Sequence, residues 1–417
     1  MSPIRVLVVD DSVVVRRLVT EVLSEDPLIE VVGTASNGKL GVAKVDQLKP
    51  DLVTLDIEMP EMNGLEALRE IRKKYPRLPV VMFSTLTQAG ASATLDALAM
   101  GASDYVTKPA NVGSITQGMQ AIREELTPKV HALCRRSSFG ARPAPAQAPS
   151  TPSFAPLRPS VNPAARPGIG TIRTSIGALG GLGRPQVSTH GSTSATHAAM
   201  PPTAAPARTV PRSTKIDLVM IGSSTGGPNA LATIWAHLPR DFPVPIIITQ
   251  HMPPMFTTLF AERLTKMGTI PVSEATDGMV LKPGAAFLAP GDHHLVLDAN
   301  APNGRIRITK DAPVNSCRPA VDPMFQSAVK VFGGNVLAVV LTGMGSDGLD
   351  GCRTAREAGG HVVTQDENTS VVWGMPGHVT QAGLSDSVLP IDRIAGEIIQ
   401  RVGQGRLVAG ASARRAG

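Results

Sequence analysis

The 417-residue sequence has few cysteines, few aromatic residues and no long apolar run. Its three cysteines, Cys134, Cys317 and Cys352, are widely separated and lack the spacing of metal ligands, so the sequence suggests neither a disulfide framework nor a zinc site. No apolar run reaches the roughly 18 residues of a membrane-spanning helix. The segment from Met1 to Asp10 also lacks the basic start and cleavage site of a signal peptide. We therefore expect a cytoplasmic protein that is not embedded in a membrane.

Acidic residues are missing from one long stretch, from Pro128 to Ser213, which contains ten lysines and arginines. Because the whole chain has a formal net charge of +6, removing these ten charges leaves about −4 for the remainder. The stretch is rich in Pro, Ala, Ser, Thr and Gly, a composition that cannot bury enough apolar surface to offset its ordering entropy. We expect residues 135–213 to be a disordered basic linker. Since aromatic residues are also scarce at 3%, we expect no nucleic-acid binding.

A serine in a glycine-rich loop, a histidine and an aspartate each follow a strongly apolar run, and we take them to be Ser224, His251 and Asp347. The three runs cover residues 216–221, 244–249 and 336–341. If these runs are parallel strands, their polar ends meet at one edge of a sheet, where open α/β folds bind ligands.

This set of residue types matches the requirements of an activated hydroxyl nucleophile. A serine hydroxyl needs an imidazole to accept its proton and a carboxylate to orient that imidazole. Ser224 lies in a Gly-x-Ser-x-Gly pattern before a helix expected to begin at Pro228, and the backbone N–H groups near Thr225 to Gly227 are candidates for oxyanion stabilisation. The order Ser, His, Asp differs from that of α/β-hydrolases, so the pattern does not predict that fold.

Other residues compete for the same roles, and the pattern alone leaves them open. A glycine-serine turn after a strand also serves as a phosphate-binding loop or a plain tight turn. Ser223 is the alternative nucleophile and Asp350 the alternative acid. The alternative bases are His237, His293, His294, His361 and His378.

The N-terminal segment contains a separate group of acidic residues. Apolar runs end at Asp10-Asp11 and at Asp56, a third ends at Ser84, and Lys108 follows a fourth. Carboxylates gathered after neighbouring strands repel one another unless a cation lies among them, and Mg²⁺ prefers oxygen ligands. A lysine and a hydroxyl nearby complete a phosphate-binding pocket.

Short apolar strands alternate with amphipathic helices along the chain and predict an α/β protein with two doubly wound parallel sheets. In the first part, strands are expected near 4–9, 28–35, 51–55, 79–83 and 103–106, with a last helix near 114–134. In the second part, helices are expected near 228–237, 255–267, 321–332, 348–358 and 390–403. The segment from Ala286 to Ile308 is expected to form a local β-ribbon.

The first 130 or so residues resemble the receiver domain of two-component signalling, which is flavodoxin-like. Matching positions imply Asp56 as the phosphoacceptor, Asp10 and Asp11 as Mg²⁺ ligands, and the backbone carbonyl of Glu58 as a further ligand. They also imply Ser84 as the switch hydroxyl, Tyr105 as the switch aromatic residue, and Lys108-Pro109 as the lysine and cis-proline pair.

From about residue 214 the chain is similar to the Rossmann-like catalytic domain of the chemotaxis response regulator protein-glutamate methylesterase family. The resemblance implies Ser224, His251 and Asp347 as a catalytic triad, with Thr225 and the backbone N–H of Met344 at the oxyanion hole. We expect a receiver domain over 1–134, the linker over 135–213, a catalytic domain over 214–405 and a flexible tail over 406–417. Met252, Met344 and Met375 are candidates for an apolar rim around the site, although each is an ordinary core residue when taken singly.

The resemblance implies a phosphorylation-activated esterase that hydrolyses glutamate methyl esters on cytoplasmic helices of chemoreceptors and deamidates receptor glutamines. It implies a chemotaxis histidine kinase as the phosphodonor, Mg²⁺ for receiver phosphorylation and no cofactor for ester hydrolysis. The linker is longer than is usual in the family, which predicts weaker inhibition by domain contact. The alternative is a regulator whose C-terminal domain only binds a partner, using the glycine loop to hold a phosphate or a peptide.

Overall fold

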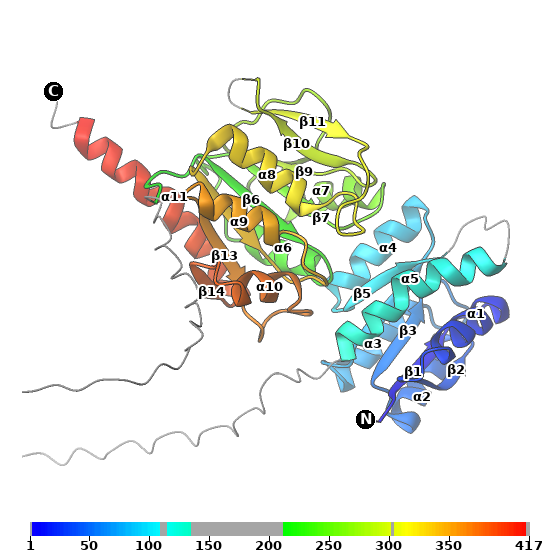
Figure 1. Cartoon of the computed structure of the whole chain (residues 1–417). Coiled ribbons are helices and arrows are strands. Elements are labelled where there is room, and N and C mark those ends of the chain that lie inside the picture. Colours follow the sequence, from blue (N-terminus) through cyan, green and yellow to red (C-terminus); the bar gives the residue numbers. More distant parts are fainter. Residues whose placement is uncertain (1, 109–114, 135–211, 302–303, 414–417) are drawn as a thin grey trace, which may run out of the picture. The chain divides into compact units, whose positions relative to one another are not determined.

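The computed structural model of the chain describes residues 2–108, 115–134, 212–301 and 304–413. The expected linker over 135–213 lies almost wholly outside these residues, and Pro109 lies outside them too. The described elements form two parallel sheets with helices beside them and a two-stranded ribbon (Figure 1). No helix in the described part of the chain is long and apolar enough to cross a membrane.

The first sheet has five parallel strands in the order β2-β1-β3-β4-β5. The strands are β1 (Ile4–Val9), β2 (Ile29–Ala35), β3 (Leu52–Asp56), β4 (Val80–Ser84) and β5 (Asp104–Thr107). The helices are α1 (Val13–Ser24), α2 (Gly38–Leu48), α3 (Gly64–Lys74), α4 (Gln88–Ala99) and α5 (Ile115–Cys134). The five strands and the last helix lie within one or two residues of their predicted positions, and the other helices lie between the strands as predicted.

Alternation along the strands divides the core of this part into two layers. On β1, Leu7 and Val9 pack with residues of α2, α3 and α4, whereas Val6 and Val8 pack with residues of α1 and α5. This is the arrangement that period-two side chains impose on a sheet covered on both faces. The chain order reverses between β1 and β3, so the open edge above these two strands is the expected ligand position.

The second sheet has seven parallel strands in the order β14-β13-β12-β6-β7-β9-β8. The strands are β6 (Leu218–Ser223), β7 (Ile246–Gln250), β8 (Val272–Glu274), β9 (Ala286–Leu288), β12 (Val336–Val340), β13 (His361–Gln365) and β14 (Ser387–Leu389). An antiparallel ribbon is formed by β10 (His294–Asp298) and β11 (Arg305–Thr309). The helices are α6 (Gly227–Trp235), α7 (Phe256–Met267), α8 (Val321–Phe332), α9 (Leu349–Glu357), α10 (Met375–Gln381) and α11 (Ile391–Ala413).

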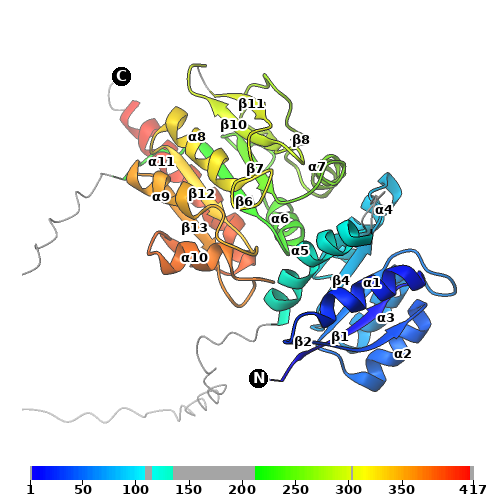
Figure 2. The same ribbon diagram turned by 45° about the vertical axis from the view of Figure 1, so that its right-hand side comes forward.

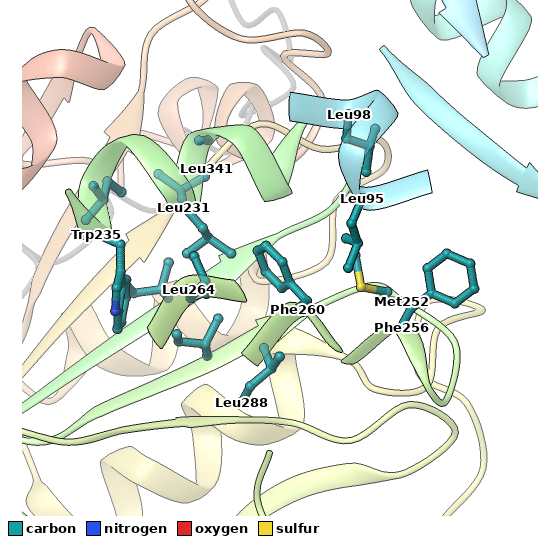
Figure 3. Packing of buried hydrophobic residues seen from close by; sticks show 14 of the residues in the cluster. Leu95, Leu98, Leu231, Trp235, Met252, Phe256, Phe260, Leu264, Leu288 and Leu341 are labelled. Carbon is teal, nitrogen blue, oxygen red and sulfur yellow. The ribbon is translucent and has the colours of Figure 1, made fainter. Parts of the chain in front are cut away.

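Helices cover both faces of this sheet as well (Figures 1 and 2). Residues of α6, α7 and α11 share one apolar cluster with Val219 and Ile221 of β6, and residues of α8, α9 and α10 share another with Leu218 and Met220. Figure 3 shows part of the first cluster, in which Trp235, Leu264 and Phe260 are packed together. The two clusters together hold strands β6, β7 and β12 rigidly at the centre of the sheet.

Three details of the second part differ from the expectation. The segment Ala286–Leu288 is a strand of the main sheet, and only β10 and β11 form the ribbon. The predicted helices do not include the short helix α10, which Pro376 starts, since it lies in the first turn, where no backbone donor is needed. Helix α11 continues to Ala413, beyond its expected end near 403 and into the expected tail.

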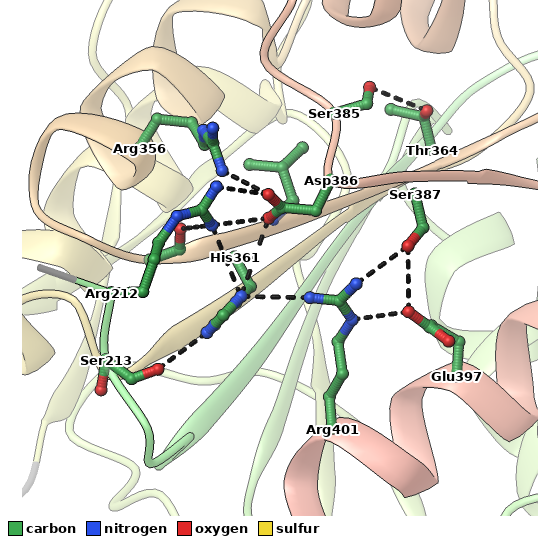
Figure 4. A network of polar contacts seen from close by, with 12 residues as sticks. Arg212, Ser213, Arg356, His361, Thr364, Ser385, Asp386, Ser387, Glu397 and Arg401 are labelled. Carbon is green, nitrogen blue, oxygen red and sulfur yellow. Dashed lines mark hydrogen bonds and ion pairs between the residues drawn. The ribbon is translucent and has the colours of Figure 1, made fainter. Parts of the chain in front are cut away.

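A polar network fastens the start of the second part to the amino edge of its sheet (Figure 4). Arg212 donates to Asp386 Oδ2 at 2.8 Å and to the Gly360 carbonyl at 3.0 Å. Arg356 also pairs with Asp386, and His361 contacts the Ser213 carbonyl at 2.8 Å. This edge is opposite the one that carries the candidate catalytic residues, so the network is a structural anchor.

Candidate active site

Ser224 follows β6 in a turn that the surrounding backbone holds tightly. Its N–H donates to the Thr342 carbonyl at 3.1 Å, and its carbonyl accepts from the Gly227 N–H at 2.8 Å. Gly226 has a φ of +77°, which favours glycine, and lets the chain turn directly into α6. A Cβ at Gly343 would lie 2.8 Å from Ser224 Cβ, so the neighbouring loop approaches the serine only because this residue is glycine.

Ser223 is fully buried, and its hydroxyl donates to Gln250 Oε1 at 2.7 Å. The Gln250 amide in turn donates to the carbonyls of Ser224 at 3.0 Å and His251 at 3.2 Å. Ser223 is therefore engaged in holding the strand ends together, which leaves Ser224 as the better candidate nucleophile. Gln250 is a positioning residue that the sequence analysis missed, although a polar residue at the end of an apolar strand was a signal for it.

His251 and Asp347 form a hydrogen-bonded pair, with His251 Nε2 lying 2.8 Å from Asp347 Oδ2. Three backbone N–H groups also donate to the Asp347 carboxylate, those of Val321 at 2.6 Å, Asp322 at 3.1 Å and Gly348 at 3.0 Å. Two of these belong to the first turn of α8, whose dipole favours a negative charge. The carboxylate is thus buried but fully supplied with donors.

The electrostatics of the pair follow from these contacts. Burial alone raises the pKa of Asp347, but hydrogen bonds from His251 and from the backbone outweigh it and hold the pKa below its usual value. Burial alone lowers the pKa of His251, but the contacts with Asp347 and Cys317 outweigh it and raise the pKa. The carboxylate and the thiol therefore favour the imidazolium, the form that a general base takes after it has accepted a proton.

Ser224, Thr225, His251 and Met344 line one cavity of about 610 Å³. Within the described residues, no hydrogen bond joins the Ser224 hydroxyl to the His251 ring. Cys317 and Arg318 line the same cavity, and so do Asp104, Tyr105 and Lys129 from the first part of the chain. The structure therefore brings the candidate nucleophile, the candidate base and the candidate oxyanion-hole residues to one cavity.

The competing bases and acid lie elsewhere. Each competing histidine contacts a nearby backbone carbonyl, namely His237 that of Thr233, His293 that of Gly291, His294 that of Ala312, His361 that of Ser213 and His378 that of Gly374. None of them lines the cavity that holds Ser224. Asp350 pairs with Arg353 on the surface of α9.

At the edge of the first sheet, carboxylate oxygens of Asp10, Asp11 and Asp56 lie within 4.8 Å of one another. Lys108 Nζ lies 2.7 Å from Asp56 Oδ2 and 3.1 Å from Asp10 Oδ2. Burial, together with repulsion from Asp10, raises the pKa of Asp56 to about 6 despite the lysine. Apart from the Lys108 ammonium, neither of the two buried Oδ2 atoms has a hydrogen-bond partner in the described part of the chain, so this donor set fits a hard divalent cation. The side chain of Glu58 is exposed and outside the cluster, and its backbone role stays a prediction.

Ser84 contacts α4, the helix that packs against α6 and α7 of the second part of the chain. Tyr105 contacts the second part directly. The Ser84 hydroxyl accepts from Thr94 at 2.6 Å and lies 3.2 Å from the Gly90 carbonyl, both in α4. The Tyr105 ring stacks on Phe256 of α7 with centroids 4.9 Å apart. Next to it, Thr225 donates to Asp104 Oδ2 at 2.6 Å, so the residue after Ser224 contacts the receiver-like part directly.

Comparison with known proteins gives matches over both parts of the chain. A family model described as the response regulator receiver domain matches residues 6–120, and one described as CheB methylesterase matches residues 219–398. A "Protein-glutamate methylesterase/protein-glutamine glutaminase" of Trichodesmium erythraeum is 45% identical over 97% of this chain and 100% of its own length. The chain belongs to the CheB methylesterase family.

A second member of the family, of the same name and from Nocardioides sp., is 47% identical over 97% of each chain. The solved catalytic domain of Thermotoga maritima CheB methylesterase is 43% identical, covers 45% of this chain and 98% of its own, and has a TM-score of 0.43. The predictions of a receiver domain, of a carboxyl-ester hydrolase and of an α/β fold with two parallel sheets are confirmed.

Proposed function

We propose that this chain is a protein-glutamate methylesterase that hydrolyses glutamate methyl esters on the cytoplasmic helices of chemoreceptors, and that it also deamidates receptor glutamines. The names of the relatives in its family support the substrate class. The hydrogen-bonded pair of His251 and Asp347, on the cavity that holds Ser224, is the observation that carries the proposal.

In this mechanism Ser224 Oγ attacks the carbonyl carbon of the ester, and the hydroxyl proton passes to His251 Nδ1 while Nε2–H remains bonded to Asp347. Backbone N–H groups of Thr225 and Met344 stabilise the oxyanion. His251 returns its proton to the leaving group, which departs as methanol. A water molecule then repeats the sequence on the acyl-serine and releases the glutamate side chain. With a glutamine side chain the leaving group is ammonia.

The receiver part would control this activity through phosphorylation of Asp56 by a chemotaxis histidine kinase. Asp10, Asp11 and Asp56 are the residues that would hold Mg²⁺, with the Glu58 carbonyl as a further ligand. A bound Mg²⁺ neutralises charge on the phosphoryl group and on the carboxylates. Lys108 orients the phosphoryl group, and Ser84 would leave its contacts with α4 to bind it.

Contacts between the two parts support a link from Asp56 to Ser224. The ring stack of Tyr105 on Phe256 and the hydrogen bond from Thr225 to Asp104 would both change if β5 and α4 rearranged. Arg263 also pairs with Asp96 of α4 at 2.7 Å. A phosphoryl group activates the enzyme only to the extent that it stabilises the separated arrangement over this one.

The test is methanol release from methylated receptors in the cytoplasmic membrane, with and without a small phosphodonor and Mg²⁺. We expect release by the wild-type chain, a rise with the phosphodonor, and none from Ser224→Ala. Labelling of Ser224 by a serine-directed acylating reagent separates an enzyme from a module that only binds a partner. Absence of both methanol release and Ser224 labelling would contradict the proposal.

A further inference from the structure

A tight turn between β11 and α8 contacts two of the candidate catalytic residues at once. Val314 and Cys317 pair through two backbone hydrogen bonds, of 3.1 and 2.9 Å. The two residues between them, Asn315 and Ser316, have φ values of +52° and +62°. Two residues of positive φ make a primed turn, which usually contains glycine, so this conformation is held by its surroundings.

The surroundings of the turn fix both of its ends. His294, which is buried, lies 3.2 Å from the Ala312 carbonyl through one ring nitrogen and accepts the Ala320 N–H at 3.2 Å through the other. Arg318 donates twice to Asp292 Oδ1, at 3.0 and 2.6 Å. The turn from Val314 to Cys317 is therefore a rigid element that can position the side chains it carries.

Asn315 binds the acid of the candidate triad. Its amide nitrogen lies 3.0 Å from Asp347 Oδ1 and 2.9 Å from Asp322 Oδ2. Because Asp347 Oδ2 faces His251, Asn315 fixes the opposite oxygen and with it the plane of the carboxylate. Asn315 makes both contacts from a backbone conformation of positive φ.

Cys317 binds the base. Its sulfur lies 3.4 Å from His251 Nδ1. In the neutral imidazole Nε2 carries the hydrogen that is donated to Asp347, so Nδ1 has the free lone pair and the thiol is the donor. In the imidazolium the direction reverses and the sulfur accepts. In either form the thiol occupies the nitrogen that would have to accept the proton of Ser224.

We propose that Cys317 is a positioning residue of the esterase, whose thiol holds His251 Nδ1 in the resting site and is displaced by the Ser224 hydroxyl before attack. The proposal rests on the proposed function, in which Ser224 is the nucleophile and His251 the base. It explains why the two line one cavity without a hydrogen bond between them in the described structure. An S–H donor is weak, so the competition is modest and reversible.

The first test compares Cys317→Ala with the wild-type chain. Removing the competitor is expected to raise kcat about three-fold and the rate of Ser224 acylation by the same factor, with KM unchanged, since one weak hydrogen bond is removed. A packing role predicts the reverse, because Ala leaves a void beside the imidazole. A kcat that is lower than or equal to that of the wild type would overturn the proposal. If the Cys317→Ala protein does not fold, Cys317→Val serves, because it also lacks a donor and the same rise in kcat is expected.

The second test does not depend on esterase activity. The imidazole should make Cys317 react with iodoacetamide faster than Cys134, a partly exposed cysteine whose pKa burial raises to about 12. In His251→Ala, alkylation of Cys317 should fall about ten-fold while that of Cys134 stays constant, as measured by mass spectrometry of each peptide. Equal alkylation of Cys317 in both proteins would show that the contact is absent.

The two hypotheses fail in different ways. If Ser224→Ala keeps full turnover, the proposed nucleophile is wrong, whereas the dependence of Cys317 alkylation on His251 is unaffected. If turnover persists in Ser224→Ala and disappears when Cys317→Ala is added, Cys317 is itself the nucleophile, and its assignment as a positioning residue is overturned.

Discussion

The two sheets place polar residues at the same kind of edge but with opposite electrostatics. At the receiver edge, Asp10 and Asp56 crowd together and burial raises both pKa values, even with Lys108 beside them. At the esterase edge, Asp347 is more completely supplied with donors and its pKa is lowered. The receiver edge therefore gains from a bound cation, whereas hydrogen-bond donors of the protein compensate the charge of Asp347, although burial raises the pKa of its neighbour Asp322 to about 6. In both parts the parallel sheet places these residues at the carboxyl ends of its strands. The groups around each carboxylate then determine whether its pKa is raised or lowered.

Removal of the candidate nucleophile is expected to have the largest effect on esterase activity. Ser224→Ala should lower kcat by about 10⁴- to 10⁶-fold and leave the fold intact, because a side chain without a hydroxyl cannot form the acyl intermediate. Methanol release and circular dichroism measure the two effects. Ser223→Ala is the matched control and should lose far less, since the Ser223 hydroxyl is buried against Gln250. Near-normal turnover by Ser224→Ala would reassign the nucleophile.

Asp347→Asn tests the pairing of a charged carboxylate with His251 at the esterase edge. We expect kcat to fall by roughly 10³ to 10⁴, less than for Ser224→Ala, because an amide stabilises the wrong tautomer of His251. The pH profile of kcat should also change, since the carboxylate raises the pKa of the imidazole. An unchanged rate would mean that His251 needs no carboxylate.

Asp56→Asn tests the receiver edge. It should abolish phosphorylation by a small phosphodonor, and the esterase should stay at its basal rate. Radiolabel incorporation with and without Mg²⁺ is the measurement. Acid-labile phosphate at wild-type stoichiometry on Asp56→Asn would rule out this residue as the acceptor.

Deleting residues 1–211, which keeps the anchoring contacts of Arg212 and Ser213, tests how the two edges communicate. Removal of the contacts at Thr225 and Phe256 should raise basal methanol release about five- to ten-fold and abolish the response to the phosphodonor. The long expected linker lowers the effective concentration of one part beside the other, so the rise should be at the lower end. If the shortened protein is no faster than the unphosphorylated chain, the receiver does not inhibit.

The smallest effect is expected for a substitution at the amino edge of the second sheet, opposite the candidate catalytic residues, and it concerns stability. Burial raises the pKa of Asp386, but hydrogen bonds with His361 and Arg212 outweigh it and lower the pKa from 3.8 to about 2. Since the folded pKa is below the unfolded one, this stabilisation is present above about pH 4 and is lost as the pH falls to 2. Asp386→Asn should reduce the free energy of unfolding by about 2 kcal/mol at pH 7 and by little at pH 2. Urea titrations at both pH values measure this.

The strands and the ends of the strands could be predicted from the sequence because local apolar runs define them. Asp56, Ser224 and His251 stand at such ends, and the structure places them there. Asn315 and Cys317 could not be predicted, because their contacts depend on a turn of positive φ whose residues lack glycine. The place of β9 in the main sheet could not be predicted either, because three apolar residues do not indicate which strand they pair with.

The loop that carries Gly343 contacts one of the two tryptophans of the chain, and this matters for fluorescence measurements. Gly343 pairs with Trp373, and the indole of Trp373 donates to the Gln365 carbonyl at 3.0 Å. Both tryptophans of the chain, Trp235 and Trp373, belong to the esterase part, whereas both tyrosines, Tyr75 and Tyr105, belong to the receiver part. Indole emission therefore comes from the esterase alone. Trp373, whose backbone pairs with the glycine that approaches Ser224, is a built-in fluorophore of this part and needs no label.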